Sequence, residues 1–276
     1  MFLAVRLPCN IEILSVGNEL LLGNTVNTSA SWIAKQVTKL GGKVTRVTTV
    51  ADNLEEISRA VREGTRRRPD FLITTGGIGP TFDDMTLKAV ARALRAPLRL
   101  NRAALKMVRV HYARRFPKRR ISLTKPRLKM AIIPSGSLPL YNPVGTAPGV
   151  RMPAGNTAIF CLPGVPREAK AIFGDSVSKF IVERSGGVKF AEKWVKVHGA
   201  MESVLAPIID RVMRRWPGVY IKSHPRSGEG RGRPFIELHL SISSSKPRRA
   251  EQSLLGAFEE IVKHLADLGA NVRSVK

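Results

Sequence analysis

Three glycines within four positions precede two aspartates in the segment from residue 74 to 86, which reads TTGGIGPTFDDMT. Glycine has no side chain to hold a phosphate away from the backbone, and the start of a following helix offers unpaired N–H groups with a partial positive charge. We therefore expect this segment to bind an anion. The residues that we expect to contact its phosphate groups are Thr75, Gly76, Gly77, Gly79 and Thr81.

The glycine pattern matches neither of two common phosphate-binding loops. No Gly-Lys-Ser/Thr follows, as a Walker loop requires, and Gly77-Ile78-Gly79 lacks the third glycine of the dinucleotide fingerprint. A tight turn without a ligand is therefore an alternative interpretation, because glycines also serve turns.

Asp83 and Asp84 lie where the sequence predicts the first turn of a helix. Carboxylates at that position stabilise a helix whatever the protein does. Beside a phosphate-binding loop, however, two carboxylates repel an anionic ligand, unless a divalent cation bridges them or one carboxylate transfers a proton or activates water. We therefore favour a Mg²⁺-type site here and treat both aspartates as candidate catalytic residues.

Two further polar segments follow apolar runs. Residues 17 to 27, GNELLLGNTVN, supply the amides of Asn18 and Asn27 and the carboxylate of Glu19. Asp52 follows the next apolar run, where Asp52-Asn53 fits a catalytic acid or a helix N-cap equally well. The predicted metal ligands are Glu19, Asp52 and Asp84.

These segments need a scaffold that brings them together. Strands are expected at Ile11–Val16, Val44–Val50 and Phe71–Thr75, and helices at Ser29–Leu40, Asn53–Arg66 and Asp84–Leu94. This alternation predicts an α/β fold, with a mostly parallel sheet and helices on both faces. Because the carboxyl ends of parallel strands share one edge, we expect the polar segments to meet there.

The pattern changes near residue 185. Before it we expect a basic helix at Arg102–Phe116, a strand at Met130–Ile133, a Pro/Gly-rich loop at Pro134–Pro148, a strand at Ala158–Leu162, a helix at Arg167–Glu183 and a linker at Arg184–Gly187. After it we expect strands at Lys193–Val197, Val219–Ser223 and Phe235–Ile242, and helices at Glu202–Arg214 and Pro247–Leu268. The sequence thus predicts a domain of residues 1–185 and a small α+β domain of residues 186–276 with an antiparallel sheet.

The composition is strongly basic, with 46 Lys and Arg, 21 Asp and Glu, and a net charge of +25. Such a surface attracts polyanions, which include nucleic acid, nucleotides and phosphorylated metabolites. Nucleic acid is the least favoured of these, because the chain shows no aromatic-rich basic motif that would stack bases. A Gly-rich stretch with Arg226, Arg231 and Arg233 is interpreted as a solvated hairpin tip.

No apolar run reaches the roughly 18 residues of a membrane-spanning helix, and the first ten residues do not resemble a secretory signal. Cys9 and Cys161 stand far apart without ligand-like neighbours, so we expect buried, unreactive thiols. These features predict a cytoplasmic protein that does not contact a membrane.

Four segments, taken in order, resemble the CinA-type molybdopterin-binding domain. They are residues 17–23 (GNELLLG), 74–84 (TTGGIGPTFDD), 142–149 (NPVGTAPG) and 162–168 (LPGVPRE). The resemblance spans about residues 10 to 185, and the remainder is similar to the small second domain of CinA and its shorter archaeal relatives. The wider family includes the MogA and MoaB molybdenum-cofactor proteins.

The resemblance implies a domain that binds molybdopterin or its adenylylated form or, in CinA-like members, hydrolyses the pyrophosphate of ADP-ribose. It implies Asp52 and Asp84 as the key acidic positions, the glycines as the phosphate cradle, and Glu19 in the same pocket. It further implies a homo-oligomer. The residues implied to close the pocket are Asn142, Gly145 and Thr146.

The chain departs from the family pattern in two respects. CinA proteins usually continue with a nicotinamide mononucleotide deamidase domain, and this chain ends before one would fit, so we expect a short form without that activity. Asn18 and Phe82 replace residues that are more frequent in relatives, which affects the expected selection of base or pterin.

Three functions follow, in order of preference. The first is metal-dependent hydrolysis of the pyrophosphate of ADP-ribose or a related nucleotide, with its phosphates on the glycine loop. It is preferred because the second domain is foreign to minimal MogA-type proteins. The alternative is a molybdopterin-binding or molybdopterin-adenylylating protein of molybdenum cofactor biosynthesis. The third is nucleic-acid binding.

Overall fold

A computed structural model describes residues 9–118, 122, 124–226 and 234–275. The chain divides into two compact units, and the division falls between Ser185 and Gly186. Each unit has its own sheet and its own hydrophobic core.

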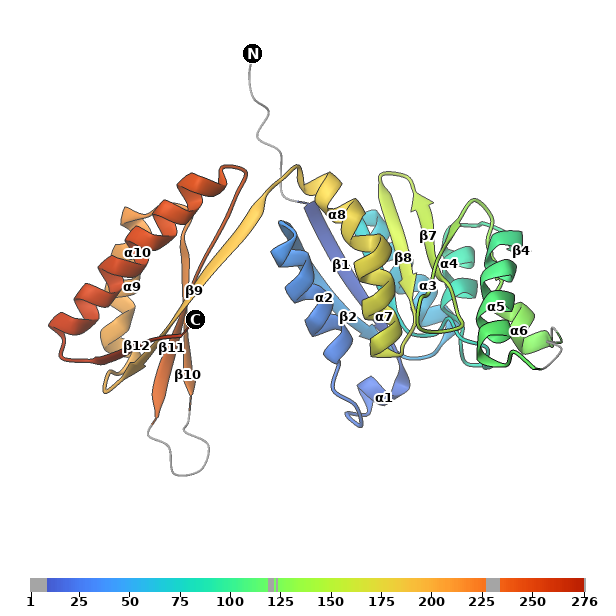
Figure 1. The fold of residues 1–276 in the computed structure, drawn as a ribbon, viewed down its shortest axis with the longest axis horizontal. Helices are drawn as coiled ribbons and strands as arrows, with labels where there is room; N and C mark the ends of the chain where they lie inside the picture. The colour runs from blue at the N-terminus through green and yellow to red at the C-terminus, as the bar shows by residue number, and fades with distance from the viewer. Residues whose placement is uncertain (1–8, 119–121, 123, 227–233, 276) are drawn as a thin grey trace, which may run out of the picture. The chain divides into compact units, whose positions relative to one another are not determined.

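The first unit contains a sheet with the strand order β2-β1-β3-β8-β7-β6 (Figure 1). Strands β2, β1, β3 and β8 are parallel, whereas β7 and β6 are antiparallel. The mostly parallel sheet is thus confirmed, and the carboxyl ends of its parallel strands share one edge. The bounds are β1 Cys9–Val16, β2 Gly42–Val50, β3 Phe71–Thr75, β6 Leu138–Leu140, β7 Gly149–Ala154 and β8 Thr157–Leu162.

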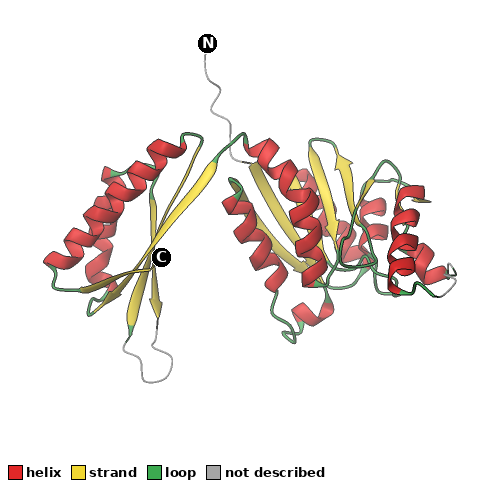
Figure 2. Cartoon of the chain, viewed as in Figure 1, coloured by secondary structure: helices red, strands yellow, loops and turns green. Residues whose placement is uncertain are grey.

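Helices cover both faces of this sheet, as predicted (Figure 2). Side chains alternate along β1, so Ile11 and Ile13 enter one core while Leu14 and Val16 enter the other. The first core lies under α2 (Thr28–Lys39), α7 (Pro166–Ile172) and α8 (Ser178–Ser185). The second lies under α3 (Leu54–Arg66), α4 (Thr86–Ala93) and α5 (Arg102–Arg115). The shorter elements are α1 (Asn18–Leu21), α6 (Lys125–Lys129), β4 (Leu98–Leu100) and β5 (Ile132–Pro134).

The helix that follows the glycine loop begins later than predicted. Helix α4 starts at Thr86, so the prediction that Asp83 and Asp84 lie in its first turn is wrong. The reason is local: the Asp84 carboxylate accepts a hydrogen bond from the Thr81 N–H at 2.8 Å and closes a turn before the helix. The N–H of Thr86 then donates to the carbonyl of Gly77 at 2.9 Å.

Two other boundaries differ from the sequence expectation. Strand β6 lies inside the segment that was expected to be a Pro/Gly-rich loop, and the predicted strand at Met130–Ile133 begins only at Ile132 because α6 precedes it. The helix expected at Arg167–Glu183 runs from Pro166 to Ser185, with a π-helical turn at Phe173–Val177. The expected linker therefore begins inside a helix.

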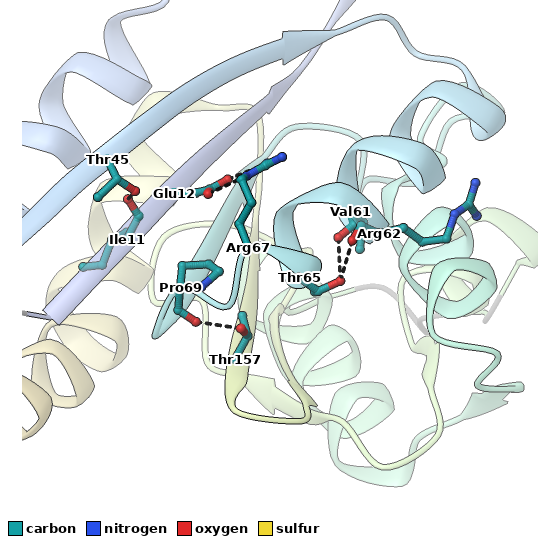
Figure 3. A network of polar contacts seen from close by, with 9 residues as sticks. All are labelled: Ile11, Glu12, Thr45, Val61, Arg62, Thr65, Arg67, Pro69 and Thr157. Atoms are coloured by element: carbon teal, nitrogen blue, oxygen red, sulfur yellow. Dashed lines mark hydrogen bonds and ion pairs between the residues drawn. The ribbon is translucent and has the colours of Figure 1, made fainter.

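A partly buried ion pair fixes β1 to the segment after α3 (Figure 3). The guanidinium of Arg67 donates from Nε and Nη2 to the two carboxylate oxygens of Glu12, at 2.8 and 2.7 Å. Glu12 is only 5% exposed, and its hydrogen bonds raise the pKa of Arg67 above its usual value. This bidentate geometry supplies the hydrogen bonds that the buried carboxylate cannot obtain from water.

The second unit is a small α+β domain, as predicted. Its antiparallel sheet has the order β10-β11-β9-β12, and its apolar core lies between this sheet and two helices. The bounds are β9 Lys189–His198, α9 Glu202–Arg215, β10 Tyr220–Arg226, β11 Phe235–Ser244, α10 Pro247–Asp267 and β12 Asn271–Val275. Strand β12 was not predicted. Arg231 and Arg233 of the predicted hairpin tip lie outside the described residues.

Two expectations about the chain as a whole can be checked in the described residues. None of the helices there is long and apolar enough to cross a membrane. Both cysteines are buried and free, and burial raises the pKa of the Cys9 and Cys161 thiols to about 12, which keeps them protonated and unreactive.

Candidate functional site

The glycine loop begins with a backbone that only glycine tolerates. Gly76 has φ +100°, and a Cβ at this position would collide with the carbonyl oxygen of Val16 on β1. Its N–H donates to the carbonyl of Leu162 at 3.0 Å, and its carbonyl accepts from the Thr86 hydroxyl at 2.8 Å. Gly76 therefore joins β1, β3 and β8, and its N–H is occupied within the fold.

The next three residues are placed differently. A Cβ at Gly77, whose φ is +66°, would collide with the Thr86 hydroxyl, and one at Gly79 would lie 2.7 Å from the Asp84 carboxylate. Within the described part of the chain, the N–H groups of Gly77, Ile78 and Gly79 donate to no other residue. These N–H groups therefore keep their hydrogen-bonding capacity.

Asp84 shapes the far end of the loop. Its Oδ2 accepts from both the N–H and the hydroxyl of Thr81, at 2.8 and 2.5 Å, and the Lys129 ammonium contacts the Thr81 carbonyl. Asp83 is exposed, and the Thr81 hydroxyl, nearby N–H groups and Lys129 hold its pKa below the usual value. Both aspartates border the loop, but only Asp84 lines a pocket.

A second loop, residues 142 to 147, faces the glycine loop and is organised by a buried amide. The side-chain N–H groups of Asn142 donate to the Ala147 carbonyl at 2.8 Å and to the Glu168 carboxylate at 2.6 Å, and its Oδ1 accepts from the Gly145 N–H at 2.8 Å. A Cβ at Gly145 would collide with that carboxylate. Gly145 is therefore required so that Glu168 can pack against the loop.

The two loops enclose a pocket of about 440 Å³, which we call the acid pocket. It contains the carboxylates of Asp84 and Glu168 beside the backbone of Gly77 and Gly79. The remaining lining residues are Pro80, Tyr112, Met130, Thr146, Ala147, Pro163, Gly164 and Val165. At Gly164 a Cβ would approach Gly76 to 3.4 Å, so this wall also stays close to the backbone of the first loop.

A second pocket, of about 580 Å³, lies on the other side of the same Pro80–Asp84 loop. It is largely apolar, and Phe82, which is 88% exposed, is part of its rim. Three ammonium groups border it, those of Lys88, Lys125 and Lys129. The loop is thus a wall shared by an acidic and a basic-apolar pocket.

A smaller hollow, of about 320 Å³, adjoins Asn142 and is lined by His111, Arg114, Arg115 and Tyr141. Arg114 donates to the Tyr141 hydroxyl at 3.1 Å. Burial lowers the pKa of His111, although the Glu168 carboxylate acts in the opposite direction.

The remaining predicted residues lie at the same sheet edge but bind each other. The N–H of Asn18 donates to the Asp52 carboxylate at 2.8 Å, and the Asp52 N–H donates to the Asn18 amide oxygen at 3.2 Å. Asn27 caps α2 and donates to Ser15 at 2.8 Å, and the Thr75 hydroxyl contacts the same serine at 3.4 Å. We call these residues the closed rim. Asn53 is the N-cap of α3, which agrees with the interpretation of Asp52-Asn53 as a helix N-cap.

The predicted metal ligands do not assemble into a cage. Among the described residues, no group of three or more His, Cys, Asp or Glu side chains is placed to hold a metal ion. Asp52 is bound by Asn18, Asp84 by Thr81, and the carboxylate of the exposed Glu19 packs over Gly17. The donor set in this structure therefore does not fit the expected Mg²⁺ site.

Glu168 is the functional candidate that reasoning from the sequence did not select. Its segment, LPGVPRE, was among the four that resemble the family, but none of its residues was assigned to the pocket. The sequence feature that could have identified Glu168 is its position, two residues after the start of α7. This helix follows β8 at the same sheet edge as the glycine loop.

Comparison with known proteins agrees with this architecture. The sequence model described as "Probable molybdopterin binding domain" matches residues 12–182. A protein of Pyrobaculum calidifontis is 44% identical over 91% of this chain and 94% of its own, and one of Pyrobaculum arsenaticum is 42% identical over 93% of both.

A solved structure is also similar, the protein CinA with unknown function from Thermoplasma acidophilum. It is 40% identical, has a TM-score of 0.57, and covers 63% of this chain and 99% of its own. The family match includes the glycine loop, Asp84, Asn142 and Glu168. The chain therefore belongs to the family of molybdopterin-binding domains that this sequence model describes.

Proposed function

We propose that the acid pocket binds a phosphorylated pterin of the molybdopterin type. The observation that carries this proposal is the pair of N–H groups at Gly77 and Gly79, two residues that line the acid pocket and whose N–H groups donate to no partner among the described residues. No Cβ at either glycine shields them from an incoming phosphate, so they suit an anion. Membership of the molybdopterin-binding family supports the pterin.

The carboxylates of Asp84 and Glu168 suit the pterin ring, at the end of the ligand away from the phosphate. A pterin ring presents an amino group beside a ring N–H, and a carboxylate accepts from two adjacent donors at once. Glu168 is held in place by Asn142, which leaves its second oxygen for a ligand. Lys129 contacts the loop that carries Asp84, so its charge offsets part of the repulsion between Asp84 and a phosphate.

Titration calorimetry with anaerobically prepared molybdopterin tests this proposal. Saturable binding is expected, with at least about tenfold weaker affinity in Glu168→Gln, because a hydrogen bond to a charged group is worth about 1.5–3 kcal/mol. Asp52→Asn, which changes a carboxylate in the closed rim, is the matched control and should leave the affinity within about threefold. Absence of binding by a folded protein would reject the proposal.

A second candidate function is hydrolysis of the pyrophosphate of ADP-ribose. The specific support is that Asp84 and Glu168 line one pocket beside the phosphate-binding backbone. In this reaction a carboxylate accepts a proton as water attacks phosphorus, and the P–O bond breaks to give AMP and ribose 5-phosphate. Because the donor set does not fit a metal, no step is assigned to one.

Release of AMP from ADP-ribose distinguishes the two candidates. The assay is run with and without added Mg²⁺, for the native chain and for Asp84→Asn. Release that the variant loses supports hydrolysis, whereas pterin binding without release supports the binding function alone. Transfer of an adenylyl group to bound pterin would appear instead as an adenylylated product.

A further inference from the structure

The second unit has one sheet face that its helices do not cover. Helices α9 and α10 pack on the same side of the sheet (Figure 2), against buried residues such as Val195, Leu238 and Ile221. Because side chains alternate along strands, the intervening residues face the other way. The strand pairing places the following on that side, which we call the open sheet face: Phe190, Glu192, Trp194, Lys196, His198, Tyr220, Lys222, His224, Arg226, Phe235, Glu237, His239, Ser241, Asn271 and Arg273.

The centre of the open sheet face is a stack of rings. Trp194 of β9 and His239 of β11 are directly paired, with ring centroids 4.0 Å apart and planes within 14° of parallel. His224 of β10 continues this arrangement at 5.8 Å from Trp194 and 29°. At one end of the same face, His198 and Phe235 lie 5.4 Å apart. These rings come from three strands, so no contiguous sequence motif announces them.

Cations surround the rings. The two carboxylates on the face are already paired: Glu237 with Arg226 at 3.0 Å and Lys196 at 3.9 Å, and Glu192 with His239 at 2.8 Å. Lys222 and Arg273 are exposed on two other strands, and neither pairs with a carboxylate among the described residues. The face therefore keeps a positive charge beside its half-buried rings.

We propose that the open sheet face binds single-stranded RNA. Nucleobases stack on ring systems whatever their identity, and Lys or Arg at the margins neutralise the phosphates between them. A four-stranded antiparallel sheet with rings on its central strands is a geometry suited to splayed bases. Asn271, which is exposed on the same face, adds a side-chain amide that can donate to and accept from ribose 2′-hydroxyl groups, which DNA lacks. Charged residues are depleted at the core of protein–protein interfaces, whereas this face carries Lys196, Lys222 and Arg273 beside its rings.

Fluorescence anisotropy with a short labelled single-stranded RNA of mixed sequence tests the proposal on the full chain. The double variant Lys222→Glu/Arg273→Glu is expected to bind at least about tenfold more weakly at roughly 0.1 M salt, because two phosphate contacts are lost. Its matched control is Arg211→Glu/Arg214→Glu on α9, which changes the net charge equally on the helix side. An equal loss of RNA affinity in both double variants would show that binding depends only on the net charge of the protein, and it would reject the open sheet face as the site.

The ring stack is tested separately from the charge. Trp194→Ala is expected to weaken RNA binding by about tenfold, whereas Trp194→Phe, which keeps a ring, should restore most of it. Circular dichroism and urea unfolding show whether each variant remains folded. Unchanged RNA affinity in folded Trp194→Ala, equal affinity for double-stranded RNA, or equal affinity for single-stranded DNA of the same sequence would overturn the proposal.

Discussion

The acid pocket and the closed rim occupy the same edge of the same sheet and contain the same kinds of side chain. In the closed rim, Asn18 and Asp52 satisfy each other, and Asn27 is bound to Ser15 and to the start of α2. In the acid pocket, the Gly77 and Gly79 N–H groups and one face of Glu168 remain available. The difference shows that position at the carboxyl end of a strand does not by itself make a residue a ligand contact; unused hydrogen-bonding capacity does.

The largest expected effect concerns Gly76, which begins the glycine loop at the edge that both regions share. Gly76→Ala should lower the free energy of unfolding by about 3 kcal/mol or more, because it combines a left-handed φ with a collision against the Val16 carbonyl. Gly23→Ala separates these causes, since Gly23 has φ +74° but open space around it, and should cost only about 1 kcal/mol. Urea unfolding measures both. Equal costs would show that the collision is relieved by backbone movement.

The next effect concerns the buried amide of the acid pocket. Asn142→Ala should cost about 2 kcal/mol of stability, because it leaves the Gly145 N–H and the Ala147 carbonyl without their partner. Asn18→Ala in the closed rim should cost less than about 1 kcal/mol, since it removes only the exposed hydrogen bond from the Asp52 N–H to the Asn18 amide oxygen, which water can replace. Urea unfolding of the two variants compares the regions directly. A larger loss for Asn18→Ala would reverse the comparison.

A smaller effect is expected on ligand affinity. Asp84→Asn should weaken binding of a phosphorylated pterin by about tenfold, since its carboxylate both lines the pocket and holds the turn at Thr81. Glu19→Gln should change the affinity by less than about threefold, because Glu19 is exposed and does not line the acid pocket. Calorimetry with one ligand preparation gives both values. Similar losses would place Glu19 in the ligand's reach.

The smallest effect is a dependence of stability on pH beside the acid pocket. Burial lowers the pKa of His111 below its ordinary value of 6.5, so the folded state favours the neutral ring. The resulting stability is fully present above about pH 6.5 and declines as the pH falls from there through the folded-state pKa. His111→Gln should reduce this decline in thermal unfolding measured at several pH values. An unchanged pH slope would show that other groups dominate it.

The sequence predicted the central part of the fold because its signals there are local. The apolar runs that form β1 and β3 are bounded by polar segments, and the glycines mark the turn between β3 and α4. The antiparallel strands β6 and β7 were not predicted because Pro139 and Pro153 interrupt them. Their pairing at the side of the sheet tolerates proline, which is typical of edge positions.

The candidate site was predictable only in part, for a different reason. Which hydrogen-bonding groups are already satisfied depends on contacts between distant residues, such as Asn18 with Asp52 and Asn142 with Glu168. Neither pair can be read from spacing along the chain. The open sheet face shows the same limit, because its rings come together only through the pairing of three strands.

The ion pair between Glu12 and Arg67 has a consequence for behaviour at high temperature. Transferring a charged group from water into the protein interior costs less free energy as the temperature rises, because the hydration of ions becomes less favourable. The attraction between the two groups, at 2.7 Å, changes little in comparison. The link between β1 and the end of α3 should therefore strengthen relative to the surrounding apolar contacts on heating.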